Sequence, residues 1–150
     1  MVIEIAEEKD IEELYDLQLL AFESEAEMVG SRAVPALMET LEKAKSDFKE
    51  WIVLKTTSES GKIIGSVRCR KQDGFIEVGR LMVHPKYRRR GIGEMLLKEV
   101  EERFLGETLE LFTCTKSVSN IRLYEKVGYK AFKEEGGHNG LSFVYMRKKA

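Results

Sequence analysis

The sequence predicts a mixed α/β domain whose sheet is at least partly antiparallel. Apolar runs of strand length alternate along the chain with segments of helical periodicity. The turn residues Gly61 and Asp73-Gly74 join consecutive strand candidates closely enough for hairpins. With 150 residues, 43% of them hydrophobic, the chain suits a single domain, residues 1–150, that buries about two-thirds of its unfolded surface.

The first strand candidate covers residues 2–5, where polar and apolar residues alternate. The helix after it is expected to be capped by Asp10, with Glu13 completing a capping box. Apolar positions at helical spacing extend this helix to Phe22. The N-terminal part is therefore expected to place one helix directly after one short strand.

An acidic segment, residues 23–27, follows and is expected to form a loop near the substrate. Residues 33–48 predict a second helix, in whose first turn Pro35 is tolerated. The remaining elements are predicted as strands at 51–55, 63–70 and 75–83, a helix at 92–104, a strand at 109–114, a helix at 117–127 with Gly128 after it, and strands at 129–133 and 141–146.

The stretch from Gly79 to Gly93 is the most informative part of the sequence. An apolar strand ends at His84, a basic loop follows, and Gly91 and Gly93 open an amphipathic helix. The first turn of a helix has unpaired N–H groups and the positive end of the dipole, and glycines let a ligand lie directly against that backbone. This arrangement suits a pyrophosphate, and three arginines lie just upstream: Arg88, Arg89 and Arg90.

Other interpretations of this stretch have less support. Three arginines before a helix also occur in ordinary solvated loops. A dinucleotide-binding turn requires a third glycine where this chain has Leu96, and it follows its strand without the basic connector present here. The phosphate-loop pattern Gly-x4-Gly-Lys-Ser/Thr is absent from the sequence.

Arg88-x-x-Gly91-x-Gly93, after a strand that ends in Leu-Met-Val-His-Pro, resembles the acyl-CoA-binding motif of the GNAT acetyltransferase superfamily. A second match, from Asn120 to Tyr129, looks like the family's LYEKxGF segment between a helix and a strand. The two segments stand in the family's order, and the resemblance covers essentially the whole chain. It implies an α/β (α+β) GNAT-like acyl-CoA N-acyltransferase fold: a seven-stranded, splayed, mixed but mostly antiparallel sheet with helices on both faces.

The resemblance also implies that CoA lies in the gap between the fourth and fifth strands. Gly79 is the expected site of the irregularity that opens the gap, because an interior strand glycine often marks a bulge; it would equally make room for a neighbouring side chain. The implied CoA-binding residues lie on the fourth strand, the basic loop and a later helix: Leu81, Met82, Val83, Arg88, Arg89, Arg90, Gly91, Ile92, Gly93, Ser117, Asn120 and Tyr124.

Tyr124 is the implied general acid for the departing thiolate. It shares a helix face with Ser117 and Asn120, and a phenol of pKa ~10 can protonate a thiolate whose acid has a pKa of ~8.5 at modest cost. From the residues alone, a core aromatic is the more usual role. The family pattern has Asn where this chain has Ser117, so Asn120 is expected to take over the polar contact to the pantetheine arm.

Glu77, on the fourth strand, is the implied catalytic base. A carboxylate of pKa ~4 is a poor base for an amine unless burial raises its pKa. Glu25 in the acidic segment is a competing candidate, His84 is a third, and some family members use no dedicated base.

The acceptor side gives two opposed expectations. Arg68 and Arg70 share one face of a predicted strand, and Arg80 is on the next strand. These arginines suit a substrate carboxylate, although pairing with glutamates on neighbouring strands is the commoner role. Residues 1–50 hold 14 Asp/Glu against 5 Lys/Arg, whereas residues 51–150 hold 12 against 20. That asymmetry favours a cationic acceptor near the acidic segment, unless its glutamates merely solvate a helix end: Glu23, Glu25 and Glu27.

Composition excludes several other classes. The net charge is −1, and the basic residues lack the aromatic interleaving of nucleic-acid-binding proteins. No apolar run approaches the ~18 residues of a membrane span. Cys69 and Cys114 lack metal-type spacing, so we expect no metal, no disulfide and a reducing, cytoplasmic compartment.

The sequence therefore predicts an acetyl-CoA-dependent N-acetyltransferase. It is expected to move an acetyl group from acetyl-CoA to the primary amine of a small molecule or peptide by direct attack in a ternary complex. A homodimer is compatible with this function. The alternative is a non-catalytic acyl-CoA-binding or sensing module, against which Tyr124 argues because a pure binder needs no acid at the sulfur.

Overall fold

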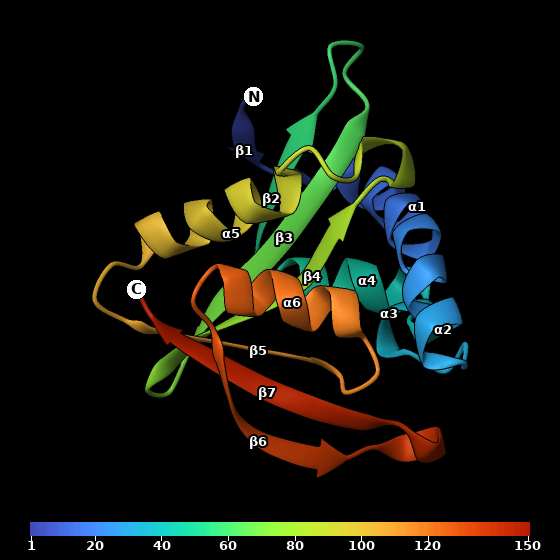
Figure 1. Ribbon diagram of the computed structural model, residues 1–150. Coiled ribbons are helices and arrows are strands. Elements are labelled where there is room, and N and C mark those ends of the chain that lie inside the picture. The colour runs from blue at the N-terminus through green and yellow to red at the C-terminus, as the bar shows by residue number, and fades with distance from the viewer.

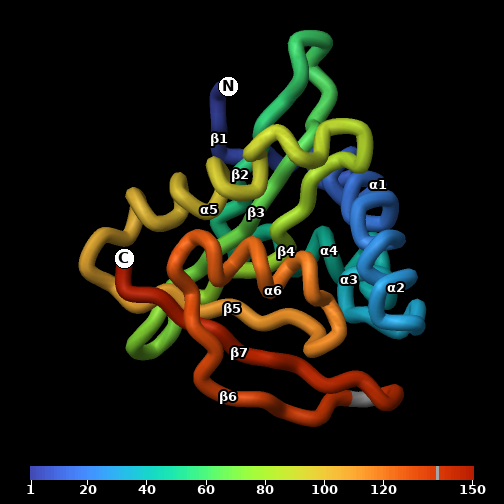
Figure 2. Tube along the Cα trace, in the orientation of Figure 1, coloured from blue at the N-terminus to red at the C-terminus, as the bar shows by residue number. Residues whose placement is uncertain are grey.

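A seven-stranded mixed sheet forms the centre of the protein in the computed structural model, which describes residues 1–150 apart from the side chain of His138 (Figures 1 and 2). The strand order is β1-β2-β3-β4-β5-β7-β6, and every neighbouring pair is antiparallel except β4 and β5. The strands are β1 (Ile3–Ile5), β2 (Ile52–Thr57), β3 (Ile63–Gln72), β4 (Phe75–Val83), β5 (Thr108–Cys114), β6 (Lys130–Gly136) and β7 (Ser142–Lys149).

Helices cover both faces of the sheet, as the sequence predicted. The helices are α1 (Ile11–Ala21), α2 (Glu23–Val29), α3 (Pro35–Met38), α4 (Leu41–Phe48), α5 (Ile92–Arg103) and α6 (Val118–Lys126). In Figure 1, α5 and α6 lie on the near face, whereas α1 to α4 lie on the far face and at its edge. Short 3-10 turns precede α1 and follow β4, at Glu8–Asp10 and Pro85–Tyr87. Within the described residues, no helix combines the length and the hydropathy of a membrane span.

Two apolar clusters hold the helices against the sheet. On one face, Leu96 and Val100 of α5 are fully buried together with Val67 of β3. On the other face, Leu14 of α1 packs with Met82 of β4. Burial of such side chains stabilises the fold by roughly 1.5–3 kcal/mol each. The packed helices therefore hold both faces of the sheet in place.

The sheet splits between β4 and β5. These parallel strands pair only at Ile76 with Leu109 and at Glu77 with Glu110, and the C-terminal half of β4 has no strand partner on that side. A register shift in the β3–β4 ladder lies in the same half of β4, where Arg80 has a φ of 47°. The expected irregularity is therefore present, but it lies at Arg80, one residue beyond Gly79.

Two of the predicted N-terminal elements were wrong. The acidic segment 23–27 is not a loop but part of α2, which Gly30 ends with a φ of 75°. The predicted helix 33–48 is two helices, because Glu39 and Thr40 are extended and the Thr40 hydroxyl accepts a hydrogen bond from the Lys43 N–H at 3.1 Å. Thr40 thus caps a new helix, α4.

Asp10 also behaves differently from the prediction. Its carboxylate accepts hydrogen bonds from the Glu7 N–H and from Lys55 Nζ, both at 2.8 Å, rather than capping α1. Glu13 accepts a hydrogen bond from the Ile63 N–H at 2.7 Å. Both acidic residues therefore tie α1 and its preceding turn to the sheet, and the capping box that Asp10 enters is that of the preceding turn, with Glu7 rather than Glu13.

Candidate active site

Two cavities open from the gap between β4 and β5 and meet there. One, about 480 Å³, lies between α2, the basic loop, α5 and α6, and we call it the loop cavity. The other, about 370 Å³, lies between α3, α4, β3, β4 and β5, and we call it the arginine cavity. Four residues line both: Phe22, Glu25, Leu81 and Asn120. Chemistry between two bound molecules would take place at this junction.

The loop cavity is built around the N-terminus of α5. Arg89 has a φ of 64° and Gly91 a φ of 79°, so the loop turns sharply before the helix. Gly91 is the N-cap residue, and a Cβ at this position would meet no atom within 4 Å. Because the first turn of a helix presents unpaired N–H groups and a partial positive charge, this end of the cavity is suited to an anion.

Most of the predicted CoA-binding residues line the loop cavity: Leu81, Met82, Val83, Arg88, Arg89, Gly91, Ile92, Gly93 and Asn120. Arg90 lies outside the lining, with its guanidinium 5.0 Å from the centre of the Tyr87 ring. Arg88 donates a hydrogen bond to the Ala21 carbonyl at 2.7 Å, and burial lowers the pKa of its guanidinium. One role of Arg88 is therefore to fix the loop to the end of α1.

His84 sits under the start of this loop. It is buried, and its Nδ1 accepts a hydrogen bond from the Lys86 N–H at 3.1 Å. Burial, together with the charges of Lys62, Lys86 and Arg88, lowers the pKa of His84. These contacts make it a residue that shapes the loop.

Glu25 is the carboxylate at the junction of the cavities. Its Oε1 accepts hydrogen bonds from Ser117 Oγ at 2.6 Å and from Thr113 Oγ1 at 3.4 Å. Ser117, which the sequence placed among the CoA-binding residues, is fully buried and lines neither cavity. Asn120, in contrast, lines both cavities.

Tyr124 lines the arginine cavity next to the junction. It is 7% exposed, and its ring packs edge-on against Tyr129 with centroids 6.1 Å apart. Burial, reinforced by the Glu25 charge, raises the pKa of Tyr124. Its hydroxyl is therefore protonated at neutral pH, which is the form a general acid requires.

In the wall of the arginine cavity, two arginine side chains pack against one tryptophan ring. The guanidinium carbons of Arg68 and Arg70 each lie 4.1 Å from the centre of the Trp51 ring. Arg70 Nε pairs with Glu77 Oε1 at 3.0 Å, and Gln72 donates to the same oxygen at 2.8 Å. The predicted base Glu77 thus lines this cavity, but two donors hold its carboxylate.

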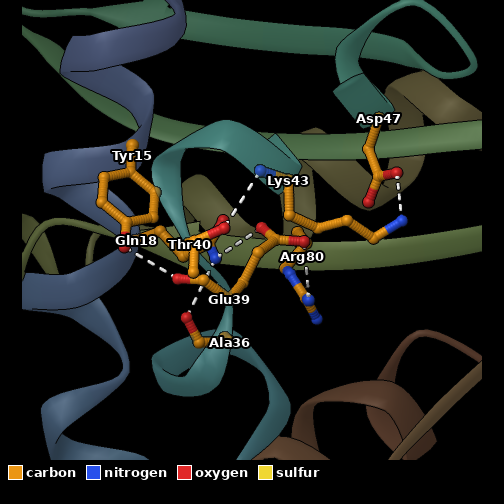
Figure 3. A network of polar contacts seen from close by, with 8 residues as sticks. All are labelled: Tyr15, Gln18, Ala36, Glu39, Thr40, Lys43, Asp47 and Arg80. Carbon is orange, nitrogen blue, oxygen red and sulfur yellow. Dashed lines mark hydrogen bonds and ion pairs between the residues drawn. The ribbon is translucent and has the colours of Figure 1, made fainter. Parts of the chain in front are cut away.

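Arg80, which lines the arginine cavity, also belongs to a polar network that links α1, α3 and α4 (Figure 3). Its Nη2 lies 3.4 Å from Glu39 Oε2, and Gln18 Nε2 donates to the other oxygen of Glu39 at 3.0 Å. Tyr15 donates to the Glu39 carbonyl at 2.7 Å, so the break between α3 and α4 is fixed from α1. The network anchors the helices that close one side of the arginine cavity.

Sequence reasoning missed Trp51 and Glu39. Trp51, the single tryptophan, is the first residue of the predicted strand 51–55, and that position was the available signal. Glu39 was hidden inside a helix predicted as continuous.

Cys69 and Cys114 are free and buried, and burial raises the pKa of each thiol to about 11. The described residues include no group of three or more His, Cys, Asp or Glu side chains able to hold a metal ion.

The splayed sheet, the glycine-containing loop at the start of α5 and the two joined cavities together define an acyltransferase. Residues 37–150 match the family described as Acetyltransferase (GNAT) domain. The chain therefore belongs to the GNAT acetyltransferase family.

The chain is also similar to individual known proteins. The chain is 31% identical to the S-(2-succino)cysteine N-acetyltransferase of Bacillus subtilis (strain 168), over 96% of this chain and 93% of that protein. It is 28% identical to the UPF0157 protein YqkA of the same organism, over 79% of this chain but only 34% of the length of YqkA. Among solved structures, the PaiA N-acetyltransferase of Thermoplasma acidophilum, crystallised with coenzyme A, aligns over 100% of both chains with a TM-score of 0.74 and 21% identity.

Proposed function

We propose that the protein transfers an acetyl group from acetyl-CoA to a primary amine by direct attack in a ternary complex. The observation that carries this proposal is the meeting of the loop cavity and the arginine cavity in the gap between β4 and β5. A carrier in one cavity and an acceptor in the other would bring thioester and amine together at Glu25, Leu81 and Asn120.

Acetyl-CoA fits the loop cavity on physical grounds. The pyrophosphate would lie against the backbone N–H groups at Gly91 to Gly93, where the helix dipole and the nearby arginines favour negative charge. A Cβ at Gly93 would come within 3.2 Å of Leu123 Cδ2, so this glycine keeps the first turn of α5 close to α6. The coenzyme A complex of the PaiA relative supports the same choice of carrier.

The transfer needs a stabilised oxyanion and two proton movements. The amine nitrogen attacks the thioester carbonyl carbon, the C–N bond forms and the C–S bond then breaks. The backbone of Leu81 to Val83, which has no strand partner on the β5 side, supplies N–H donors to the carbonyl oxygen. Tyr124 gives its proton to the departing thiolate and recovers one from solvent.

Glu25 is our proposed base, either directly or through a water molecule. It lies at the junction of the cavities and accepts hydrogen bonds from two neutral hydroxyl groups, whereas Glu77 lines only the arginine cavity and is paired with the cationic Arg70. Glu77, the base expected from the family resemblance, remains the alternative. The test compares Glu25→Gln with Glu77→Gln.

Direct transfer is also supported by the state of the cavity thiol. Cys114 lines the arginine cavity, but burial and the Glu25 charge raise its pKa to about 11. A thiol of that pKa is almost wholly protonated at pH 7 and is a poor nucleophile. Intact-mass measurement after incubation with acetyl-CoA alone should therefore show no acetylated enzyme.

The activity is tested by following free-thiol release from acetyl-CoA with a panel of primary amines. S-(2-succino)cysteine is the first acceptor to include, because the relative from Bacillus subtilis is named for it. Release above the rate of the Tyr124→Phe variant, with a product heavier by one acetyl group, supports the proposal. Tight acetyl-CoA binding without release for any amine would favour a sensing module instead.

A further inference from the structure

We propose that the acceptor amine carries a carboxylate and that Arg68, on the wall of the arginine cavity, binds it. This inference rests on the proposed function, because it names the class of amine that the arginine cavity admits. It goes beyond the family's chemistry, which requires only an amine.

Arg68 lacks an ion-pair partner, and its Nε lacks a hydrogen-bond acceptor, among the described residues. Within the described part of the chain, no carboxylate oxygen lies within 4.0 Å of its guanidinium, and its Nε is buried without a hydrogen-bond acceptor. Burial, followed by the charge of Arg80, lowers the pKa of Arg68 to about 10. Charged groups that lose water normally gain an ionic partner, and Arg68 lacks one.

The other cations around Arg68 are already paired. Arg70 is held by Glu77 at 3.0 Å. Arg80 is 3.4 Å from Glu39. Lys43 pairs with Asp47 at 2.8 Å. Among the cations that line the arginine cavity within the described residues, Arg68 is therefore the one with no carboxylate within 4.0 Å, although the Nε of Arg80 is also buried without an acceptor.

The surroundings of Arg68 leave room for a ligand. Arg68 is opposite Gly79 in the β3–β4 ladder, and a Cβ on Gly79 would lie 4.0 Å from Arg68 Nε and 3.9 Å from Trp51 Cη2. Because Gly79 has no side chain, the cavity extends to the guanidinium. Trp51 stacks on Arg68 and so fixes the plane in which its N–H groups point, which suits bidentate binding of a carboxylate.

The position of Arg68 also sets the form of the acceptor. Its ladder partner Gly79 is two residues before Leu81, which lines the junction, and two extended residues span at most roughly 7 Å, a length that the irregularity at Arg80 shortens. The carboxylate should therefore be several bonds from the reacting amine. Amino acids with a distal carboxylate meet this requirement.

The test uses acceptors that differ only in that carboxylate. L-glutamate, 5-aminopentanoate and S-(2-succino)cysteine are each compared with the amide of the distal carboxylate in the thiol-release assay. We expect at least tenfold higher kcat/KM for the carboxylates. Arg68→Gln should reduce that preference to within about twofold, mainly through KM for the acceptor, while KM for acetyl-CoA stays constant.

Two further variants guard against a folding artefact. Gly79→Val keeps the charge but fills the space beside Arg68, and it should also raise KM for the carboxylates. Arg103→Gln removes an arginine that pairs with Glu99 on α5, outside both cavities, and should leave the preference unchanged. In addition, succinate but not succinamide should raise the Tm of the wild type, and Arg68→Gln should abolish that shift.

The outcomes separate the two proposals. Equal use of acids and amides, or a preference that survives Arg68→Gln, overturns the carboxylate proposal but leaves the acetyltransferase proposal standing. Absence of thiol release with every amine counts against the acetyltransferase proposal, and the succinate measurement then decides the role of Arg68 independently. No Tm shift with succinate in that case would overturn it.

Discussion

Replacing Arg68 with methionine should stabilise the free protein, which is unusual for a substitution inside a cavity wall. Methionine keeps the aliphatic stem of the side chain and removes a charge that has no ionic partner among the described residues. The expected gain follows from the pKa of Arg68, which burial lowers from 12.5 to about 10. That difference corresponds to roughly 3 kcal/mol of unfavourable folding free energy at neutral pH.

Part of this gain is offset by the lost contact with Trp51, which is 4.1 Å from the guanidinium carbon. Such a cation–π contact contributes roughly 0.5–2 kcal/mol, which leaves a net stabilisation of roughly 1–3 kcal/mol. For a domain of this size, each kcal/mol raises Tm by about 2–4 °C. Thermal unfolding in a buffer without carboxylates should therefore show a higher Tm for Arg68→Met.

The pH dependence provides an internal check. Because the folded pKa lies below the unfolded one, the penalty is fully present below about pH 10 and disappears as pH rises towards 12.5. The difference in stability between the variant and the wild type should thus be constant from pH 6 to 9. The matched control, Arg70→Met, removes the partner of Glu77 and should lower Tm. A fall in Tm for Arg68→Met as large as that of the control would refute the reasoning.

Four further predictions concern the junction, the loop and the N-terminal ion pair. Tyr124→Phe should keep Tm and CoA affinity but lose most turnover, at least tenfold, since only the proposed proton donor is removed; unchanged turnover would return Tyr124 to a packing role. Gly91→Asp should abolish CoA binding in calorimetry because it adds a negative charge where the pyrophosphate is proposed to lie, and wild-type affinity would contradict that placement. Glu25→Gln should lower kcat/KM more than Glu77→Gln, with the largest loss at low pH, where more of the amine is protonated; the reverse order would assign the base to Glu77. Burial alone would raise the pKa of Asp10, but the hydrogen bonds it accepts lower it, so its stabilisation is present above about pH 4 and is lost as pH falls below that value. Asp10→Asn should therefore cost roughly 1–2 kcal/mol at pH 7 in urea unfolding and less at pH 3.

The individual strands and the glycine-containing loop before α5 were accessible from local sequence patterns, whereas the splayed order of the seven strands came from the family resemblance. Alternating and continuous apolar runs marked the strands, and Arg88, Gly91 and Gly93 marked the helix start that lines the cavity. Such features depend on residues close in sequence, where periodicity and glycine chemistry are informative.

The acceptor side was less accessible because it depends on contacts between distant segments. The division of the predicted helix 33–48 depends on Glu39 turning inward to Gln18 and Arg80, which no local pattern shows. The same holds for the arginines of β3: the sequence favoured pairing with glutamates, which the structure shows for Arg70 but not for Arg68. Only the three-dimensional arrangement separates the two.

The short pairing between β4 and β5, which consists of two residue pairs, affects how easily the sheet can bend. Strands β1 to β4 form one antiparallel unit and β5 to β7 another, and in the sheet they are hydrogen-bonded to each other only around Ile76 and Glu77. A narrow bonded strip of this kind bends more easily than the ladders on either side of it. We therefore expect the angle between the two units to widen when a bulky carrier enters or a product leaves, without breaking strand pairing within either unit. Amide hydrogen exchange should report this motion as faster exchange at the residues paired across this strip, Ile76, Glu77, Leu109 and Glu110, than in the middle of β3.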